Sequence, residues 1–318
     1  MHLSVREVLQ LSERCFAAAG FSEGTARSHA ESIWWTEAYK GSGFTTLHDH
    51  LDVLEDFDAT ALSLREQGSR TALIDGDGQP GLVASTPALD FACSKADQHG
   101  LGVAAATTAD DDGLRPTLGH VAYAAAERGY VGVVLVADGA GGSTTVVATP
   151  DEPHPFVAEL ALDAPSGGLV DLLDVFDAGL HRRRDDPLAQ AVFRRDEADQ
   201  YPTAQKRLLN RLLQRATEPD EDPRIDVPPG FVTLCVDPTT PPYADGVRQL
   251  VERFVDDHEE AFTHVYRPRE IHDHAETLLH EGVDVEEDRW RDVFEYSSRV
   301  LAPEFEGSYR GAGFNINE

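Results

Sequence analysis

The fold is decided by the stretch from Thr71 to Gly142, which opens Thr71-Ala72-Leu73-Ile74-Asp75-Gly76-Asp77-Gly78-Gln79-Pro80-Gly81. Its first four residues predict a short apolar strand, and the glycine-rich residues after them predict a turn. A helix is expected next, because apolar residues recur at spacings that share one face, and Gly100 suits the left-handed position that ends a helix. The run Leu101-Gly102-Val103-Ala104-Ala105-Ala106 then predicts a second strand.

The alternation of strands and helices continues to the end of this stretch. A helix over Val121–Glu127 leads into an apolar strand over Val131–Val136. Strand, helix, strand, helix, strand is the order typical of an α/β core. The strands lack polar alternation, which indicates burial on both faces. We therefore predict an α/β fold in which helices surround a mixed sheet.

Composition bounds the class of protein and its surroundings. At 318 residues, with 41% hydrophobic and 8% aromatic residues, the chain can bury a sizeable core. Its formal net charge is −30, and only three of its 27 basic residues are lysines. Charges of one sign repel each other at low ionic strength, whereas the Debye length falls to about 3 Å at 1 M salt. We expect a protein of a high-salt cytoplasm, with a solvated acidic surface.

The same sequence disfavours several partners and locations. Its negative charge argues against nucleic acid as a partner. No run of about 18 apolar residues predicts a membrane span, and the N-terminus lacks a signal-peptide pattern, so a cytoplasmic location is expected. Cys15, Cys93 and Cys235 lie far apart in apolar settings, which predicts buried thiols and no metal site.

Three segments carry a family resemblance: Ile74-Asp75-Gly76-Asp77-Gly78, His99-Gly100-Leu101-Gly102-Val103 and Ala125–Gly132. They resemble the malate/L-lactate dehydrogenase family, whose members are NAD(P)-dependent reductases of 2-oxo acids with a fold distinct from the Rossmann dehydrogenases. The resemblance covers most of the chain. It implies the malate/L-lactate (sulfolactate) dehydrogenase-like fold, with N- and C-terminal helices packed together. It also implies a homodimer, NAD or NADP as cofactor, and a small 2-oxo acid as ligand.

Four regions are expected along the chain. They are an N-terminal helical arm over 1–70, a central α/β core over 71–180, a compressed basic helical insert over 181–229, and a C-terminal strand–helix part over 230–318. The arm is expected to pack with the C-terminal part. Within the arm, Ser4 and Glu7 fit a capping box that starts the first helix. A third helix is expected to run through residues 47–54.

The family's Ser-His-Gly signature carries a histidine that donates a proton to the substrate carbonyl, and an arginine three residues after the glycine. Alignment places Ser42 at the histidine, keeps Gly43, and places Thr46 at the arginine. A serine hydroxyl does not donate a proton near neutral pH as an imidazole does, and threonine lacks the charge that clamps a carboxylate. We expect the proton donor and one carboxylate anchor to be lost. His48 and His50 lie one to two helical turns further on, and either one of them is a substitute donor or both are exposed helix-face histidines near Asp49 and Asp52, which we favour.

A second family motif, Asn-x-x-His-Phe-Gly, should follow the strand that ends at Ala106. Gly113 fits its glycine, which places Asp111 at the histidine and Thr108 at the asparagine. The aspartates at 110–112 could coordinate a hard cation, although a salt-adapted loop is the interpretation we favour. His120 is expected to face the same site. These assignments make Ser42, Thr46, His48, Asp111 and His120 the candidate catalytic residues.

The resemblance also implies positions near the cofactor. His154 stands where the family has an asparagine before a proline, and Asp174 stands where a strand-end aspartate lines the nicotinamide, or is simply a surface residue. Pro268, Arg269 and Glu270 correspond to a Pro-Gly-Glu turn that contacts the cofactor. The Gly-x-Lys-Gly element of the family has no counterpart between residues 176 and 229.

Two further features have alternative interpretations. The glycine-rich residues 138–143 follow a strand and could cradle a phosphate, although their spacing fits no nucleotide fingerprint. Residues 181–215 hold nine basic and five acidic residues, a local charge of +4 in a chain of −30. This basic island either binds an anionic partner or pairs with acidic residues of the protein itself, which we favour.

Three functions remain open on the sequence alone. The first is a family-type NAD(P)-dependent oxidoreductase acting on a 2-oxo or 2-hydroxy acid. The second is a catalytically inactive paralogue that serves as a binding or regulatory subunit, which the eroded motifs favour. The third is a new ligand site built from His48, Asp111, His120 and the basic island.

Overall fold

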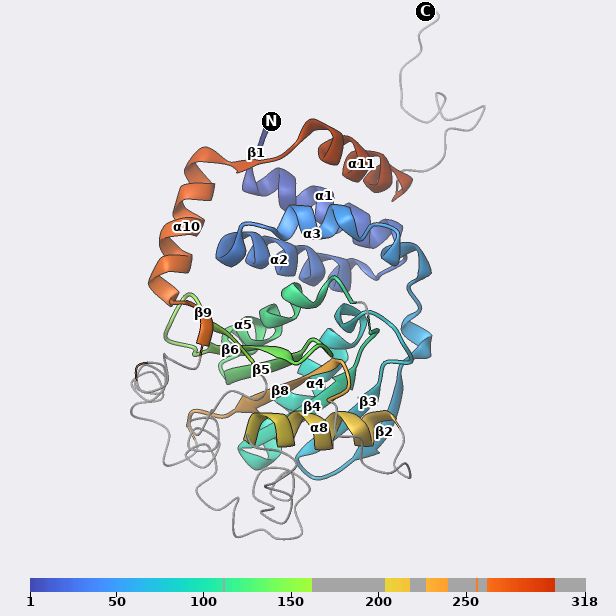
Figure 1. The fold of residues 1–318 in the computed structure, drawn as a ribbon, viewed down its shortest axis with the longest axis vertical. Coiled ribbons are helices and arrows are strands. Elements are labelled where there is room, and N and C mark those ends of the chain that lie inside the picture. Colours follow the sequence, from blue (N-terminus) through green and yellow to red (C-terminus); the bar gives the residue numbers. More distant parts are fainter. Residues whose placement is uncertain (111, 162–203, 218–226, 240–255, 257–261, 301–318) are drawn as a thin grey trace, which may run out of the picture.

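The centre of the molecule is an eight-stranded mixed sheet (Figure 1). The computed structural model describes residues 1–110, 112–161, 204–217, 227–239, 256 and 262–300. In spatial order the strands are β2 (Ser63–Gln67), β3 (Thr71–Asp75), β4 (Leu101–Thr107), β8 (Gly230–Val236), β5 (Val131–Ala137), β6 (Gly142–Ala148), β7 (Phe156–Ala161) and β9 (Phe262–Tyr266). Strands β3 and β4 are parallel, and the other adjacent pairs are antiparallel. The predicted α/β fold with a mixed sheet is confirmed.

Strand β8 holds the two halves of the sheet together. It lies between β4 and β5, so that Leu234 is opposite Val103 on one side and Val133 on the other. Every residue of β4, β5 and β8 is buried. The predicted burial of these strands on both faces is therefore confirmed, and their unbroken apolar runs are explained.

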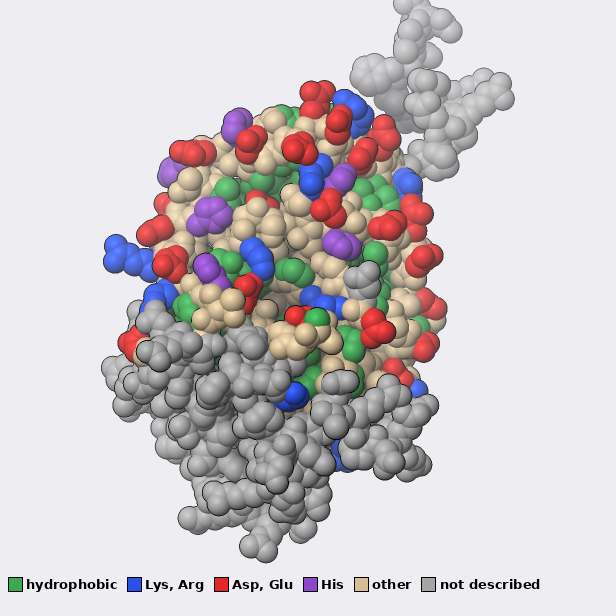
Figure 2. Space-filling view, viewed as in Figure 1, with side chains coloured by type: hydrophobic (Ala, Val, Ile, Leu, Met, Phe, Trp, Pro, Cys, Tyr) green, Lys and Arg blue, Asp and Glu red, His purple; other side chains and the backbone are tan. Residues whose placement is uncertain are grey.

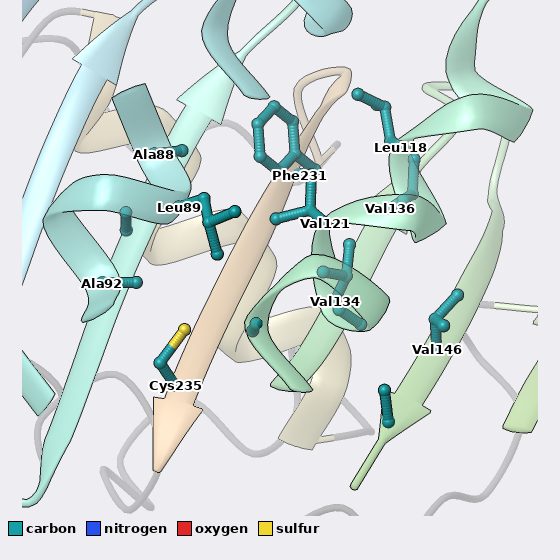
Figure 3. Packing of buried hydrophobic residues seen from close by; sticks show 14 of the residues in the cluster. Ala88, Leu89, Ala92, Leu118, Val121, Val134, Val136, Val146, Phe231 and Cys235 are labelled. Atoms are coloured by element: carbon teal, nitrogen blue, oxygen red, sulfur yellow. The ribbon is translucent and has the colours of Figure 1, made fainter. Parts of the chain in front are cut away.

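Helices cover both faces of this sheet. Helices α4 (Gly81–His99) and α5 (His120–Glu127) pack on one face, where Leu89 and Val121 meet Val134 and Phe231 (Figure 3). Helix α8 (Ala204–Thr217) packs on the other face through leucines at 208, 209, 212 and 213. The helices approach closely because glycines face them: a Cβ on Gly102 would lie 1.9 Å from an α4 carbonyl oxygen.

A second helical layer joins the two ends of the chain above α4 and α5 (Figure 1). It contains α1 (Val5–Ala18), α2 (Glu23–Lys40), α3 (Gly43–Asp49), α10 (Pro268–Glu281) and α11 (Glu287–Ser297). Strand β1 (His2–Leu3) pairs with β10 (Val283–Asp284), and Cys15 and Val293 of the two terminal helices share one core cluster. The expected packing of N- and C-terminal helices is confirmed. The capping box of Ser4 and Glu7 is also present.

The single helix expected through residues 47–54 is wrong. Helix α3 ends at Asp49, and a separate 3-10 turn, η1, spans Val53–Asp56. His50 leaves the helical conformation at φ −128°, ψ 24°, and its ring Nδ1 bonds the Thr46 carbonyl oxygen at 2.8 Å. Further 3-10 turns are η2 (Ala59–Ala61), η3 (Arg115–Gly119) and η7 (Ser298–Val300).

Two further expectations concern the cysteines, predicted to be buried thiols, and the absence of a membrane span. All three thiols are buried and free, as predicted, and the Sγ atoms of Cys93 and Cys235 lie 3.6 Å apart between α4 and β8. Among the described residues, no helix is both long enough and apolar enough to span a bilayer.

Candidate functional site

The junction between α2 and α3 keeps its glycine for a packing reason. Gly41 ends α2 in the left-handed region, at φ 66°. At Gly43, the first residue of α3, an added Cβ would lie 2.0 Å from the Ile33 carbonyl oxygen and 2.7 Å from the Glu37 amide nitrogen. No side chain fits there, so α3 can lie against α2 only if this residue is glycine. The backbone of the signature is therefore intact.

The side chain of Glu37 on α2 holds the start of α3 at this junction. Its carboxylate is buried and accepts a hydrogen bond from the Phe44 amide at 2.9 Å. Burial raises the pKa of this carboxyl, and the amides of Phe44 and Gly43 oppose that shift. The start of α3 is thus held by α2 through a buried polar contact.

Ser42 and Thr46 are the residues that the resemblance aligns with the proton donor and the carboxylate anchor. Ser42 is the N-cap of α3 and is partly exposed, but its hydroxyl makes no capping hydrogen bond to the described part of the chain. Thr46 is buried one turn later. Neither residue supplies the imidazole or the guanidinium that the family chemistry uses.

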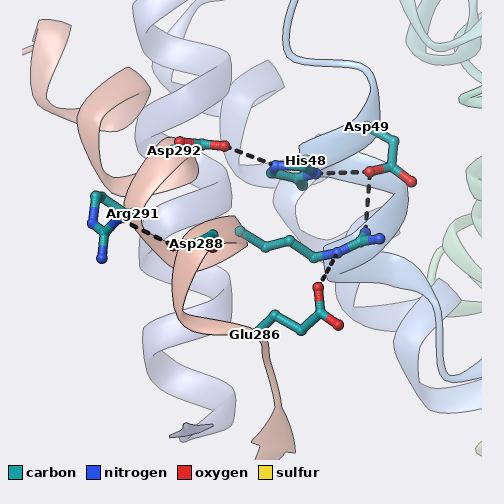
Figure 4. A network of polar contacts seen from close by, with 7 residues as sticks. His48, Asp49, Glu286, Asp288, Arg291 and Asp292 are labelled. Carbon is teal, nitrogen blue, oxygen red and sulfur yellow. Dashed lines mark hydrogen bonds and ion pairs between the residues drawn. The ribbon is translucent and has the colours of Figure 1, made fainter.

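His48 lies on the outer side of α3, in an ion-pair network with α11 (Figure 4). Its Nδ1 is 2.7 Å from Asp49 and its Nε2 is 3.1 Å from Asp292. Arg289 adds an ion pair to Asp49 at 3.0 Å, and the pKa of Asp49 is lowered, mainly by its hydrogen bond with His48. His48 therefore ties α3 to α11, and its catalytic assignment stays a prediction.

Asp112 in the acidic loop is a structural acceptor. It is buried, and its two oxygens accept hydrogen bonds from the amides of Gly81 at 2.7 Å and Leu114 at 3.0 Å. Burial raises the pKa of its carboxyl above the usual value. Both carboxylate oxygens are therefore engaged by backbone amides, which disfavours cation binding by Asp112. Asp111 lies outside the described residues.

His50 is the histidine that reaches this loop. A Cβ on Gly113 would lie only 1.6 Å from its Nε2, so the ring packs directly on the glycine backbone. Because Nδ1 donates to the Thr46 carbonyl oxygen, Nε2 carries the free lone pair when the ring is neutral. The sequence offered His48 and His50 as alternatives, and His48 was chosen as the candidate, since spacing alone does not say which ring turns inward.

A cavity of about 660 Å³ opens between the end of α2, the loop after β4, and strands β5, β6, β7 and β9. Figure 2 shows this hollow near the middle of the visible face, with basic and acidic side chains around it. Its five charged lining residues come from four separate segments: Lys40, Asp112 and Arg115 of one loop, Asp138 and Glu159. Of these, sequence reasoning gave no functional role to Lys40, Arg115 or Glu159.

Lys40 and Glu159 form an ion pair in this cavity. The Nζ atom of Lys40, the last residue of α2, is 2.7 Å from Oε1 of Glu159 on β7. Their side chains are 37% and 28% exposed, so both charges remain open to a ligand. Beside them, Tyr39 donates a hydrogen bond to the Pro116 carbonyl oxygen at 3.3 Å. Burial raises the pKa of the Tyr39 phenol.

Arg115 and Asp138 form the wall that faces the loop. The Nη1 of Arg115 donates to the Asp138 carbonyl oxygen at 2.8 Å, and its Nη2 donates to the Asp110 carbonyl oxygen. The Asp138 carboxylate accepts from the amides of Ala140 at 2.8 Å and Gly142 at 2.9 Å. Two amides of the glycine-rich turn are therefore already bonded, which disfavours a phosphate cradle there.

His120 lies in a different place from both the large cavity and His48. Together with His29 it lines a small cavity between α2, α4 and α5, and it does not line the large cavity in the described part of the chain. Burial lowers the pKa of His120 to about 4 and that of His29 to about 3. The structure thus does not bring His48 and His120 together.

Among the predicted cofactor positions that the structure describes, Arg269 stands where the resemblance implies a glycine and His154 where it implies an asparagine. Pro268 begins α10, where Glu270 already closes the first turn by accepting from the Arg267 amide at 2.9 Å. The Arg269 side chain is 91% exposed, and His154 Nε2 is 3.2 Å from His272 Nδ1. Asp174 lies outside the described residues.

The described part of the basic island supports pairing within the protein. Arg215 at the end of α8 binds both carboxylate oxygens of Glu66 on edge strand β2, its Nη2 at 2.6 Å from each. The residues at 181–203 lie outside the described part of the chain.

Comparisons with known proteins agree with this fold. Residues 3–150 match the family model described as malate/L-lactate dehydrogenase, and no curated protein matches the chain. A malate dehydrogenase from Pyrococcus horikoshii OT3 has 15% identity and a TM-score of 0.56, over 96% of this chain and 97% of that one. A sulfolactate dehydrogenase from Methanocaldococcus jannaschii has 16% identity and a TM-score of 0.55, over 94% and 97%. A dehydrogenase from Sinorhizobium meliloti has 17% identity and a TM-score of 0.59, over 93% and 99%.

Proposed function

We propose that this chain, whose residues 3–150 match the malate/L-lactate dehydrogenase family model, is a divergent member of that family that binds a small carboxylic acid without the family's efficient hydride transfer. The observation that carries this proposal is the α2–α3 junction. Its glycine is fixed by packing against Ile33, whereas Ser42 and Thr46 stand at the donor and anchor positions. The glycine that lets α3 pack on α2 is kept, whereas the histidine and the arginine that the family chemistry uses are replaced.

The expected effect on catalysis is large. Loss of a general acid alone reduces a rate by about 10²–10⁴-fold. Loss of the carboxylate anchor adds misplacement of the substrate. NAD or NADP would supply the hydride in a family-type reaction, but this chain has no counterpart of the family's Gly-x-Lys-Gly element between residues 176 and 229. We therefore assign no reaction step to this chain.

Binding is supported by the cavity that remains. Lys40 and Arg115 place two cations on its walls, and a carboxylate is the simplest complement to a lysine or arginine. Tyr39 and Val136 contribute apolar surface beside them. A cavity of about 660 Å³ is within the range that holds small ligands.

The experiment is calorimetry in molar KCl with 2-oxo acids, followed by NADH and NADPH. We expect saturable acid binding, lost in Lys40→Met and kept in Arg27→Met, an exposed substitution on the same helix. We expect no saturable binding of either nicotinamide cofactor and no acid-dependent oxidation of it. A folded protein that binds none of the acids would overturn the proposal.

A second candidate is an oxidoreductase with a new proton donor. The Lys40 ammonium in the cavity favours it, because an ammonium held beside Glu159 can give a proton to a carbonyl oxygen. Acid-dependent oxidation of NADH or NADPH that disappears in Lys40→Met, while acid binding persists in Lys40→Arg, would establish this candidate and exclude the first.

The setting of this function is also proposed. A homodimer is supported by the family resemblance, and operation at high salt by the net charge of −30. Light scattering coupled to gel filtration in 2 M KCl should give twice the mass of the 34.7 kDa chain.

A further inference from the structure

The large cavity carries charges of both signs, and their arrangement bears on the class of its ligand. Lys40 and Arg115 are cationic, while Glu159 and Asp138 are anionic. We propose that the cavity takes a zwitterion of the 2-amino acid class, whose ammonium meets Glu159 and whose carboxylate meets Lys40. This inference rests on the proposed function, because it assumes that this cavity is the binding site.

The Lys40–Glu159 ion pair offers one cationic and one anionic group to the two charged ends of the zwitterion. Lys40 uses one of its three N–H donors in the bond of 2.7 Å, and Glu159 uses one of its acceptor sites. With 37% and 28% of their side chains exposed, both ends can accept a second partner. A zwitterion lying antiparallel beside the pair closes a ring of four charges of alternating sign. Each charge then has two neighbours of opposite sign.

The opposite wall of the cavity also carries one basic and one acidic side chain, Arg115 and Asp138. Arg115 is held by backbone carbonyl groups of Asp138 and Asp110, and no carboxylate forms an ion pair with it in the described part of the chain. The Asp138 carboxylate is held by the amides of Ala140 and Gly142. Backbone bonds fix both groups in place without neutralising either, so the cavity lining holds two basic side chains and three acidic ones, the buried Asp112 included.

This balance discriminates against dianions. A dicarboxylate would place its second negative charge near Glu159 or Asp138, where like charges at close range repel. A 2-oxo monocarboxylate would find a cation but would give Glu159 no second partner beside Lys40. The amino group satisfies Glu159, so we expect an amino acid to bind at least about tenfold more tightly than the 2-oxo acid of the same side chain.

The test is calorimetry at fixed ionic strength and pH 7.5 with neutral 2-amino acids, the matched 2-oxo acids and a series of dicarboxylates. We expect the amino acids to bind most tightly. Glu159→Gln should weaken the amino acid by about tenfold and tighten the 2-oxo acid, which reverses the preference. Asp90→Asn, at an exposed ion pair on α4, should leave both affinities unchanged.

The outcomes separate this inference from the proposed function. Binding of 2-oxo acids alone, with a selectivity that Glu159→Gln does not change, overturns the zwitterion and leaves an acid-binding cavity. Binding of neither class to protein shown to be folded by its thermal transition overturns both. Should Glu159→Gln fail to fold, Lys40→Gln gives the complementary result, a loss of carboxylate affinity that affects amino acids and 2-oxo acids alike.

Discussion

The carbonyl oxygen of Ile33 occupies the space that a side chain on Gly43 would need, since an added Cβ would lie 2.0 Å from it. This contact sets the distance between α2 and α3. Alanine at position 43 must displace α3 or break the first turn, so we expect Gly43→Ala to lower the free energy of unfolding by about 2–4 kcal/mol. Urea unfolding in 2 M KCl measures the change.

Gly24 in the first turn of α2 is the matched control for this prediction. A Cβ there would meet nothing within 4 Å, so Gly24→Ala should be neutral or stabilising by up to about 1 kcal/mol. If Gly43→Ala also fell within about 0.5 kcal/mol of the native protein, the packing explanation for the retained glycine would be wrong.

Glu37 should make stability decline as pH rises. Burial raises the pKa of its carboxyl above 4.5, so the folded protein holds this proton at a pH where the unfolded chain has released it. The penalty begins near pH 4.5 and is complete above the folded pKa. Glu37→Gln keeps an acceptor for the Phe44 amide and removes the titration. We expect its stability relative to the native protein to increase between pH 5 and pH 8.

The alanine variant distinguishes charge from hydrogen bonding at this position. Glu37→Ala leaves the Phe44 amide without its acceptor, which should cost about 1–3 kcal/mol at any pH. Urea midpoints at pH 5, 6.5 and 8 give both results. A parallel pH dependence in the native and glutamine proteins would show that Glu37 is not the titrating group.

His29 should make the protein sensitive to acid. Its ring lies 4.7 Å from Phe21 and 5.3 Å from Phe16 between centroids, and burial lowers its pKa to about 3. Between pH 6.5 and 3 the unfolded chain binds the proton that the folded protein excludes, so stability is lost as pH falls. At pH 5.5 the loss is on the order of 1–2 kcal/mol. His29→Phe should flatten this decline, whereas His99→Gln, at the exposed end of α4, should preserve it.

The strongest sequence signals were those in which local pattern and tertiary environment agree. The leucines at 208–213 form the buried face of α8, and Ser4 and Glu7 cap α1 as their spacing predicts. Strands β2 and β9 were not predicted, because residues such as Arg65 and His264 give an edge strand no apolar pattern. The insertion of β8 between β4 and β5 depends on pairing across more than 90 residues, which no local pattern encodes.

The candidate site shows the same limit of local reasoning. Lys40 and Glu159 meet although 119 positions separate them, because the end of α2 lies against β7, the strand next to the β9 edge of the sheet. A lysine and a glutamate so far apart in the sequence do not by themselves predict an ion pair. His50 lies two residues from His48 and turns to the opposite side, since the chain leaves the helix at that point. Side-chain direction at a helix end depends on backbone angles that composition does not specify.

High salt should stabilise the protein by screening its charge. With a net charge of −30, mutual repulsion in the compact state is strongest at low ionic strength. We expect the thermal midpoint to rise steadily from 0.1 to 2 M KCl. Sucrose at equal water activity is the control, because it is excluded from the surface without screening charge. Equal stabilisation by sucrose and KCl would contradict the electrostatic explanation.

Arg215 and Glu66 should show a small but measurable coupling that fixes α8 to edge strand β2. Their contact is bidentate, but the side chains are 40% and 35% exposed, so screening reduces its value. A double-mutant cycle with Arg215→Ala and Glu66→Gln should give about 0.5–1 kcal/mol in 0.1 M KCl and less in 2 M. The exposed pair Arg291–Glu287 on α11 serves as the comparison, for which we expect about zero. Lysine at position 215 should recover less than half of the coupling, because one ammonium cannot match the two parallel bonds of the guanidinium. A coupling that does not change with salt would point to packing of the arginine stem rather than to its charge.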